Sequence, residues 1–276
     1  MVPMHLFQIF YDELTRASLD PNFIPLDNQN SSRPDWFEYW PIRQILLTEQ
    51  FGDQEYLGFF SPRFQEKTGL SGAQVAAKVK SATHEVISFS PFLNLSAGYL
   101  NSFYHAEDQH PGCLSLAQDY LDAAGIDVKL SRLVQDQTRI IFSNYFVAKY
   151  GFWKKWMNLT DQFFKVSEDS ANVLAPRLNA PTDHRGQTSY PMKIFIMERM
   201  VSLALELENR NAEIGINHAV AIPQGAGHLF NRILVLDALK GQYIKTGSDY
   251  FLGTYMGLRK ELFQSVQRRP PSAPAA

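Results

Sequence analysis

The sequence predicts an α/β protein whose sheet is mostly parallel and flanked by helices. Short β-rich runs alternate with helical patterns along the chain, which is typical of βαβ units. The runs at 56–61, 85–90 and 140–148 are apolar on both faces, as in strands that helices cover on both sides. With 276 residues, 45% of them hydrophobic and 20% charged, the chain carries enough apolar surface for a substantial core.

The first third of the chain supplies two strands and a helix between them. Residues 6–11 form a short apolar run and predict the first strand, whereas 20–35 are rich in Pro, Asn and Ser and predict a loop. Pro41 suits the first position of a helix, with apolar residues spaced on one face behind it. Residues 56–61 predict the second strand.

The next elements have clear boundaries. Ser71 and Gln74 form a capping box that predicts a helix running to about residue 82. Residues 85–90 predict a third strand, and Pro111 and Gly125 bracket a further helix.

The second half of the chain continues the alternation. Residues 140–148 are β-rich and predict a strand, followed by a helix with aromatic residues at helical spacing, namely Phe152, Trp156, Leu159 and Phe163. The remaining expected elements are a loop over 176–191, a long helix over 192–208, a strand over 218–222 and helices over 228–239 and 249–266. No repeat or clean linker is visible, so we expect one domain over 1–267, followed by a disordered Pro-rich tail over 268–276.

Charge and cysteine content exclude several classes. The net charge of -2 gives no electrostatic footprint for nucleic acid. Cys113 is the only cysteine, which excludes an internal disulfide framework and a Cys-based metal cluster. No run reaches the ~18 apolar residues that a membrane-spanning helix needs, and residues 1–5 carry no basic region typical of a signal peptide. We therefore expect a cytoplasmic protein.

Common cofactor and catalytic motifs are absent. The sequence contains no GxGxxG after its first expected strand, no GxxxxGK[ST], no GxSxG and no HExxH. The isolated Gly225-Ala226-Gly227 is typical of a turn. Because ligands of α/β sheets bind beyond the carboxyl ends of strands, we expect chemistry in the loops after Tyr11, Ser61, Ser90 and Ala148.

Four segments carry more polar and aromatic residues than packing requires, at 35–43, 56–67, 143–147 and 192–200. Their order and spacing resemble GT-A type glycosyltransferases of bacterial capsule and lipopolysaccharide loci. The resemblance covers roughly residues 5–225 and rests on four parts: an aromatic–acidic helix at 36–43, a strand with an Arg/aromatic loop at 56–64, an NxF strand with an aromatic helix at 144–163, and Glu-Arg in the apolar stretch 197–203.

The resemblance implies a single Rossmann-like GT-A domain. It also implies transfer of a sugar, with inversion, from a nucleotide-sugar donor to a glycan or lipid-linked acceptor in cell-surface polysaccharide synthesis. Membrane association would be peripheral at most.

Cations and one carboxylate are the principal candidates for this chemistry. Arginine suits a diphosphate through its bidentate fork, which makes Arg63 and Arg43 candidates, with Lys67 as a third cation. Glu198 takes the approximate place of the base that accepts the acceptor proton.

Further donor-binding candidates come from these segments and from the ends of the strands expected at 6–11 and 85–90. The aromatic rings expected to stack on base or sugar are Trp36, Trp40 and Tyr145, and the polar candidates are Tyr11, Asp12, Glu38, Ser61, Ser88, Ser90 and Asn144.

One departure from the family concerns the metal. GT-A enzymes usually bind Mg²⁺ or Mn²⁺ through Asp-x-Asp, but here the corresponding strand ends in Ser88-Phe89-Ser90. Glu107 and Asp108 are the nearest acidic alternative, since hard cations prefer oxygen ligands. We expect a metal-independent site, with Mg²⁺ or Mn²⁺ at Glu107 and Asp108 as the alternative.

Other interpretations remain open. Glu198 is also compatible with a structural ion pair to Arg199, Arg63 with a surface ion pair, and Asn144 with a buried amide that satisfies loop backbone. A non-catalytic carbohydrate-binding or assembly protein on the same fold is the main rival function. A methyltransferase is a third reading, disfavoured by the lack of a Gly-rich first turn.

Overall fold

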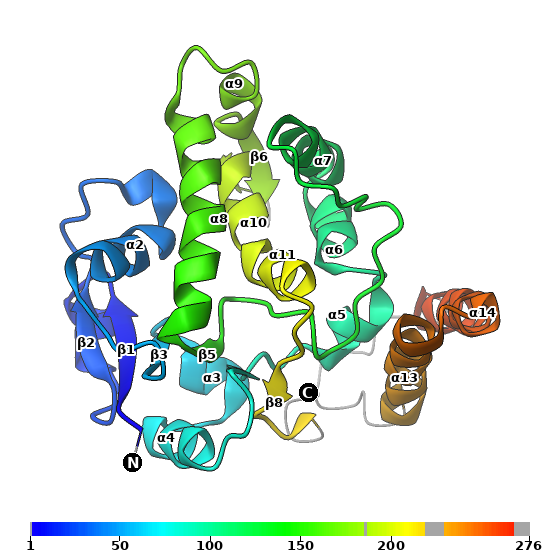
Figure 1. Ribbon diagram of the computed structural model, residues 1–276, viewed down its shortest axis with the longest axis horizontal. Helices are drawn as coiled ribbons and strands as arrows, with labels where there is room; N and C mark the ends of the chain where they lie inside the picture. Colours follow the sequence, from blue (N-terminus) through cyan, green and yellow to red (C-terminus); the bar gives the residue numbers. More distant parts are fainter. Residues whose placement is uncertain (1, 185–186, 219–228, 268–276) are drawn as a thin grey trace, which may run out of the picture.

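A computed structural model describes residues 2–184, 187–218 and 229–267. Among these residues, six strands form one sheet in the order β2-β1-β3-β5-β4-β8 (Figure 1). All of them run in the same direction except β5, which is antiparallel to both of its neighbours. The strands are β1 (Met4–Phe10), β2 (Ile24–Asp27), β3 (Tyr56–Phe60), β4 (Val86–Ser88), β5 (Phe146–Lys149) and β8 (Glu213–Ile214). The predicted α/β class with a mostly parallel sheet is confirmed.

Two strands differ from the sequence prediction. The expected loop over 20–35 contains β2, a short edge strand that pairs with β1. The expected strand over 140–148 is wrong in its first part, because β5 begins only at Phe146. Ser143 and Asn144 have φ angles of 59° and 51°, and this left-handed backbone cannot continue an extended strand.

Helices surround the sheet, and most lie near their expected places. The capping box of Ser71 and Gln74 is present at the start of α4. The helices of the first half are α1 (Glu13–Ala17), α2 (Tyr39–Thr48), α3 (Phe64–Thr68), α4 (Gly72–Lys80), α5 (Leu93–Gly98), α6 (Ser102–Gln109) and α7 (Cys113–Ala123), with the 3₁₀ turn η1 at Pro34–Trp36. Those of the second half are α8 (Tyr150–Glu168), α9 (Ala175–Leu178), α10 (Met192–Met197), α11 (Met200–Leu207), α13 (Phe230–Thr246) and α14 (Asp249–Gln267).

The predicted long helix over 192–208 is wrong, because it is interrupted between α10 and α11. The backbone N–H of Arg199 bonds the carbonyl of Ile196, three residues back, while the Arg199 side chain donates to the carbonyl of Phe195 at 2.9 Å. The side chain thus takes the acceptor that a continuous α-helix would use. The break places Glu198 and Arg199 at a helix junction.

The expected loop over 176–191 and the expected strand over 218–222 also require correction. The first holds α9 and a two-stranded hairpin of β6 (Pro181–His184) and β7 (Gln187–Pro191). The last strand of the sheet is β8, and 219–222 lie outside the described residues, as does the tail at 268–276.

Side chains alternate between the two faces of the sheet. Leu57 and Phe59 of β3 join the larger core, which α2, α7, α8, α10 and α11 complete. Tyr56 and Phe60 of the same strand join a smaller core with α3 and α4. Between them Gly58 has no room for a side chain, since a Cβ would lie 2.7 Å from Val147 Cγ2.

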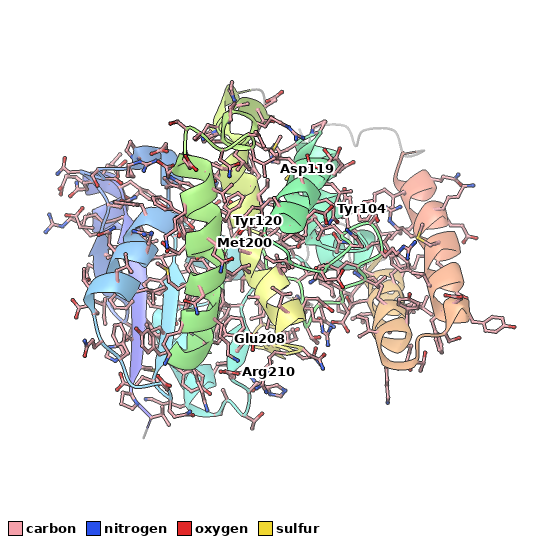
Figure 2. The ribbon with its side chains drawn as sticks, turned by 45° about the horizontal axis from the view of Figure 1, so that its top comes forward. Tyr104, Asp119, Tyr120, Met200, Glu208 and Arg210 are labelled. Atoms are coloured by element: carbon pink, nitrogen blue, oxygen red, sulfur yellow. The ribbon has the colours of Figure 1, made fainter. Side chains whose placement is uncertain are left out.

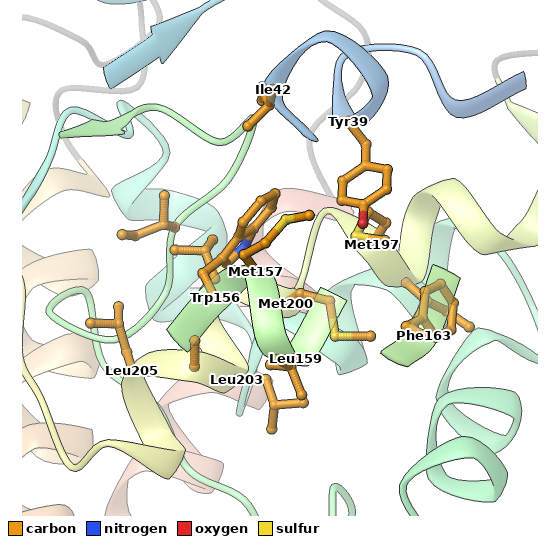
Figure 3. Packing of buried hydrophobic residues seen from close by; sticks show 14 of the residues in the cluster. Tyr39, Ile42, Trp156, Met157, Leu159, Phe163, Met197, Met200, Leu203 and Leu205 are labelled. Atoms are coloured by element: carbon orange, nitrogen blue, oxygen red, sulfur yellow. The ribbon is translucent and has the colours of Figure 1, made fainter. Parts of the chain in front are cut away.

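The larger core is built from large side chains of α2, α8 and the two helices at the junction. Figure 3 shows Tyr39, Trp156, Met197 and Met200 packed within it, and Figure 2 places Met200 with Tyr120 in the interior of the molecule. This packing fixes α10 and α11 against α8, and with them the junction that carries Glu198.

The last two helices, α13 and α14, lie at the edge of the molecule beside α5 (Figure 1). Lys240 of α13 is fully buried and donates to the carbonyls of Ser96, Tyr99 and Gln135. Among the described residues, no helix combines the length and apolarity needed to cross a membrane.

Candidate functional site

A cavity of about 1430 Å³ opens at the edge of the sheet where the parallel strands end. Tyr11 follows β1, residues 28–31 follow β2, and Ser61 follows β3. Asn144 reaches the same edge for the opposite reason: β5 is antiparallel, so the residues before it lie beside those after its neighbours. The loop after Ala148, expected to carry chemistry, therefore lies at the opposite edge.

Eight of the residues predicted from the sequence line this cavity, namely Tyr11, Trp36, Glu38, Ser61, Arg63, Lys67, Asn144 and Glu198. They come from five separate parts of the chain, so the fold brings together residues that are as many as 187 positions apart in sequence.

Tyr11 and Glu38 are polar residues of the cavity lining that contact each other. The Tyr11 hydroxyl donates to Glu38 Oε1 at 2.9 Å. Burial raises the pKa of Glu38 to about 7, and the nearby carboxylate of Glu198 adds to this, while the Tyr11 hydrogen bond and Lys67 act in the opposite direction. Glu38 can therefore exchange a proton near neutral pH.

A buried lysine connects the segment that carries Glu38 with the helix that ends at Glu198. Lys193 of α10 is only 1% exposed and pairs with Asp35 at 2.6 Å and Glu168 at 3.3 Å. Because Asp35 lies in η1, this pairing fixes the start of α2, with Glu38, against the helix that ends at Glu198.

The cations at the end of β3 differ in their surroundings. Lys67 is half-buried and lies 5.4 Å from the centre of the Tyr145 ring, whose hydroxyl is 2.6 Å from Ser61 Oγ. Arg63 is exposed and forms an ion pair with Glu66 one helical turn away, at 2.6 Å. Lys67 is therefore the cation more enclosed by the site, although the sequence pointed first to Arg63.

Asn144 combines a left-handed backbone with an unpartnered side-chain oxygen. It is 7% exposed, follows Ser143 in the left-handed region, and its side-chain oxygen has no hydrogen-bond partner within the described structure. A buried acceptor without a partner costs about 1–3 kcal/mol, which a ligand donor would recover. Strain of this kind concentrates at binding and catalytic sites.

Glu198 is half-exposed and paired with the buried Arg199. Arg199 Nη1 lies 2.6 Å from Glu198 Oε2, and Arg199 Nη2 lies 3.3 Å from His105 Nδ1. Burial lowers the pKa of His105 to about 4, and the charge of Arg199 adds to this, so the imidazole is neutral and accepts from the guanidinium. The ion pair with Arg199 thus fixes the orientation of the Glu198 carboxylate.

Four other candidates lie away from the cavity lining. Asp12 is exposed and caps α1 by accepting from the Thr15 backbone at 2.7 Å. Arg43 pairs with Asp161 of α8 at 2.6 Å. Ser88 and Ser90 are buried, and they accept from backbone N–H groups within their own edge of the sheet.

The expected stacking rings are mostly covered by protein. Tyr145 is fully buried and packs against other aromatic rings, so it offers no free face. Trp36 lines the cavity but is only 1% exposed and packs against Phe164. Trp40 is half-buried and packs against Phe164 of α8.

The alternative metal ligands do not fit a metal ion. Glu107 uses both carboxylate oxygens to accept from the backbone of Gly112 and Leu114 at the start of α7. Asp108 accepts from the Tyr99 hydroxyl and from Gln109. Neither carboxylate lines the cavity, and among the described residues no group of His, Cys, Asp and Glu is arranged to hold a metal.

Sequence reasoning missed two parts of the lining. One is the amide-rich segment 28–31, which pairing of 24–27 as a strand would have placed at the sheet edge. The other is a group of side chains from α5, α6 and the segment before β5, including Phe92, Tyr99 and His105. No motif marks this second group, because only the fold brings its members together.

No family model matches the chain, and neither the curated proteins nor the solved structures contain a significant match.

Proposed function

We propose that the protein is a glycosyltransferase that moves a sugar, with inversion, from a nucleotide-sugar donor to the hydroxyl of a glycan or lipid-linked acceptor. The observation that carries the proposal is one cavity at the strand ends that combines amide side chains, three cations and two carboxylates. Ligands of such sheets bind at this edge.

The donor would lie over the ends of β1, β2 and β3. Amide groups at 28–31 suit the hydrogen-bonding edge of a base, and Lys67 with Arg63 suits the diphosphate. The unpartnered oxygen of Asn144 would accept from a hydroxyl of ribose or sugar. In our proposal these cations neutralise the charge of the leaving group, and among the described residues no group of side chains is arranged to hold a metal.

In the transfer step, Glu198 would take the proton of the acceptor hydroxyl while its oxygen attacks the anomeric carbon. The bond from that carbon to the phosphate oxygen breaks, and the nucleoside diphosphate leaves with the electron pair. Arg199 holds one carboxylate oxygen in place and leaves the half-exposed group facing the cavity.

A thermal-shift screen tests the proposal. Uridine, guanosine and thymidine diphosphates and their common sugars should include a ligand that stabilises the protein, by about 2.7 kcal/mol at 100 times its Kd. Lys67→Ala should reduce this shift, whereas Lys154→Ala, which removes a surface pair with Asp53, should not. The absence of any nucleotide shift would contradict the proposal.

A transfer assay separates the proposal from its rival. With the identified donor, the protein should release nucleoside diphosphate, and an acceptor should increase the rate. Binding of a saccharide without donor hydrolysis or transfer would favour the non-catalytic carbohydrate-binding protein.

A further inference from the structure

One wall of the cavity has a chemistry that the donor site does not use. Phe92, Leu95, Tyr99, His105 and Phe142 line it, and we call these residues the aromatic wall. Their rings form a continuous chain: centroids are 6.1 Å apart for Phe92 and Phe142, 4.9 Å for Phe142 and His105, and 5.2 Å for His105 and Tyr99.

The aromatic wall meets the pair of Glu198 and Arg199 at His105, the third ring of the chain. His105 accepts from Arg199, and Glu198 is the half-exposed carboxylate paired with that arginine. A molecule seated on the wall would therefore pass beside Glu198.

The wall is electrically neutral. His105 is uncharged because its Nδ1 accepts the Arg199 hydrogen bond and because its pKa is lowered to about 4. The charge of Arg199 is already paired with Glu198, and its Nη1 also donates to the Phe195 carbonyl. The guanidinium of Arg259 lies beside the Tyr99 ring but is not part of the cavity lining. A phosphate or carboxylate on the wall would face the Glu198 carboxylate, which disfavours an anionic ligand.

Tyr99 is fixed on several sides, so the wall is pre-formed. Its hydroxyl donates to Asp108 at 2.7 Å, and its carbonyl accepts from the buried Lys240 at 2.8 Å. The guanidinium of Arg259 lies 5.7 Å from its ring centre. Contacts from α13 and α14 thus hold a ring that lines the cavity, and a pre-organised surface binds at lower entropic cost.

The size of the cavity agrees with two ligands. Small-molecule sites usually enclose about 300–1,000 Å³, whereas this cavity measures about 1430 Å³. The polar half suits the donor, which leaves the aromatic wall for a second molecule.

We propose that the aromatic wall is the acceptor subsite and takes an uncharged saccharide, which packs along the rings from Phe92 to Tyr99 and presents a hydroxyl to Glu198. The inference rests on the proposed function. The half-buried rings supply apolar faces for the C–H groups of a sugar, and Gln109, at the same end of the cavity, supplies an amide for its hydroxyls.

Saturation-transfer NMR of the full chain tests this subsite. The probes are methyl and phenyl β-glycosides of glucose, galactose and N-acetylglucosamine, with methyl β-glucuronide as the charged comparison, each with and without the nucleoside diphosphate that binds best. At least one neutral glycoside should bind, and the glucuronide should bind more weakly.

Variants locate the binding. Phe92→Ala should weaken the neutral glycoside about tenfold and leave the thermal shift by nucleoside diphosphate unchanged. Tyr99→Leu, which keeps an apolar side chain, gives a second measurement should Phe92→Ala fold poorly. Tyr250→Ala is the matched control, because Tyr250 is an aromatic residue of α14 that is 88% exposed; it should change neither.

Each contrary outcome is distinct. Equal glycoside binding by wild type, Phe92→Ala and Tyr99→Leu would overturn the subsite, as would preference for the glucuronide. Nucleotide binding with no glycoside binding would overturn this inference and leave the donor site standing. Glycoside binding at the wall with no nucleotide binding would contradict the proposed function instead.

Discussion

The phenol of Tyr11 donates a 2.9 Å hydrogen bond to Glu38, joining the end of β1 to the start of α2 inside the cavity. The pair lies within electrostatic reach of Glu198 and Lys67, whose effects on Glu38 oppose each other. Burial is the larger influence, and it raises the pKa of Glu38 from 4.5 to about 7. Glu38 therefore binds a proton more tightly in the folded than in the unfolded chain.

The first prediction concerns stability against pH. Since the folded chain holds this proton more tightly, the contribution of Glu38 to stability is complete below its usual pKa of 4.5 and is lost as pH rises to about 7. Glu38→Gln removes the titration. Between pH 4.5 and 7.5, wild type should lose about 1–3 kcal/mol of unfolding free energy relative to the variant, measured by urea unfolding. Parallel pH profiles would show that Glu38 does not titrate in this range.

The second prediction concerns the hydrogen bond itself. Tyr11→Phe removes a donor that lowers the pKa of Glu38, so this pKa should rise further. The side-chain carboxyl resonance of Glu38, followed by ¹³C NMR against pH, measures it. Tyr104→Phe is the control, because Tyr104 bonds only a backbone carbonyl at the surface. A fall of the Glu38 pKa in Tyr11→Phe would mean that the phenol stabilises the neutral acid.

The third prediction compares the two cations. Arg63 is exposed and paired with Glu66, whereas Lys67 is half-buried beside Tyr145. Both variants should weaken nucleoside diphosphate binding more than they change stability, and Lys67→Ala should do so more than Arg63→Ala. Charge contacts in water are screened by salt, so the loss in Arg63→Ala should be the more sensitive to ionic strength. Isothermal titration calorimetry at two salt concentrations measures the affinity of each variant for nucleoside diphosphate. Unchanged affinity in both variants would reject the phosphate role.

The sequence predicted the fold best where the signals were local. The capping box of Ser71 and Gln74 and the apolar run of β3 depend on neighbouring residues, and both elements lie where expected. The strand over 140–148 and the helix over 192–208 failed for the same reason: apolar periodicity continued through a break. Asn144 makes the first break through its backbone angle, and Arg199 makes the second through its side chain. Neither effect is visible in hydrophobic spacing.

The site shows a similar division. Candidates in strand-end loops, such as Tyr11 and Ser61, reached the cavity because the end of a strand fixes their edge of the sheet. Arg43 does not line the cavity. The sequence predicted that Arg43 lies on a helix but not toward which side of that helix it points, and it pairs with Asp161. The aromatic wall depends on the packing of α5 against α13 and α14. The hydrophobic pattern of the sequence does not predict which helices pack together.

The fourth prediction separates strain from function at Ser143 and Asn144. Both residues have positive φ, which glycine adopts without the penalty of a side chain. Ser143→Gly should therefore stabilise the protein, by about 1 kcal/mol, and keep the Asn144 amide. Asn144→Gly relieves the same backbone strain but removes the unpartnered oxygen, so it should lose donor affinity. Thermal unfolding with and without nucleoside diphosphate measures both. If Asn144→Gly binds donor as well as wild type, the unpartnered oxygen does not contact the donor.

The last prediction tests Glu198 as the base. Its carboxylate faces the cavity at the junction of α10 and α11, and one oxygen is held by the buried Arg199 at 2.6 Å. Glu198→Gln keeps the shape and the hydrogen bond capacity of that oxygen but cannot accept a proton. Transfer should fall by about 10²-fold or more, while the thermal shift by donor stays at the wild-type value. Glu206→Gln is the matched control, since Glu206 also pairs with an arginine, Arg139, but is absent from the cavity lining; its transfer rate should be unchanged.

Wild-type transfer in Glu198→Gln would mean that another group accepts the proton of the acceptor hydroxyl. Glu38 is the other carboxyl that lines the same cavity. Loss of folding in Glu198→Gln would mean that the pair with Arg199 serves the helix junction, because a buried guanidinium without its counter-ion destabilises the fold.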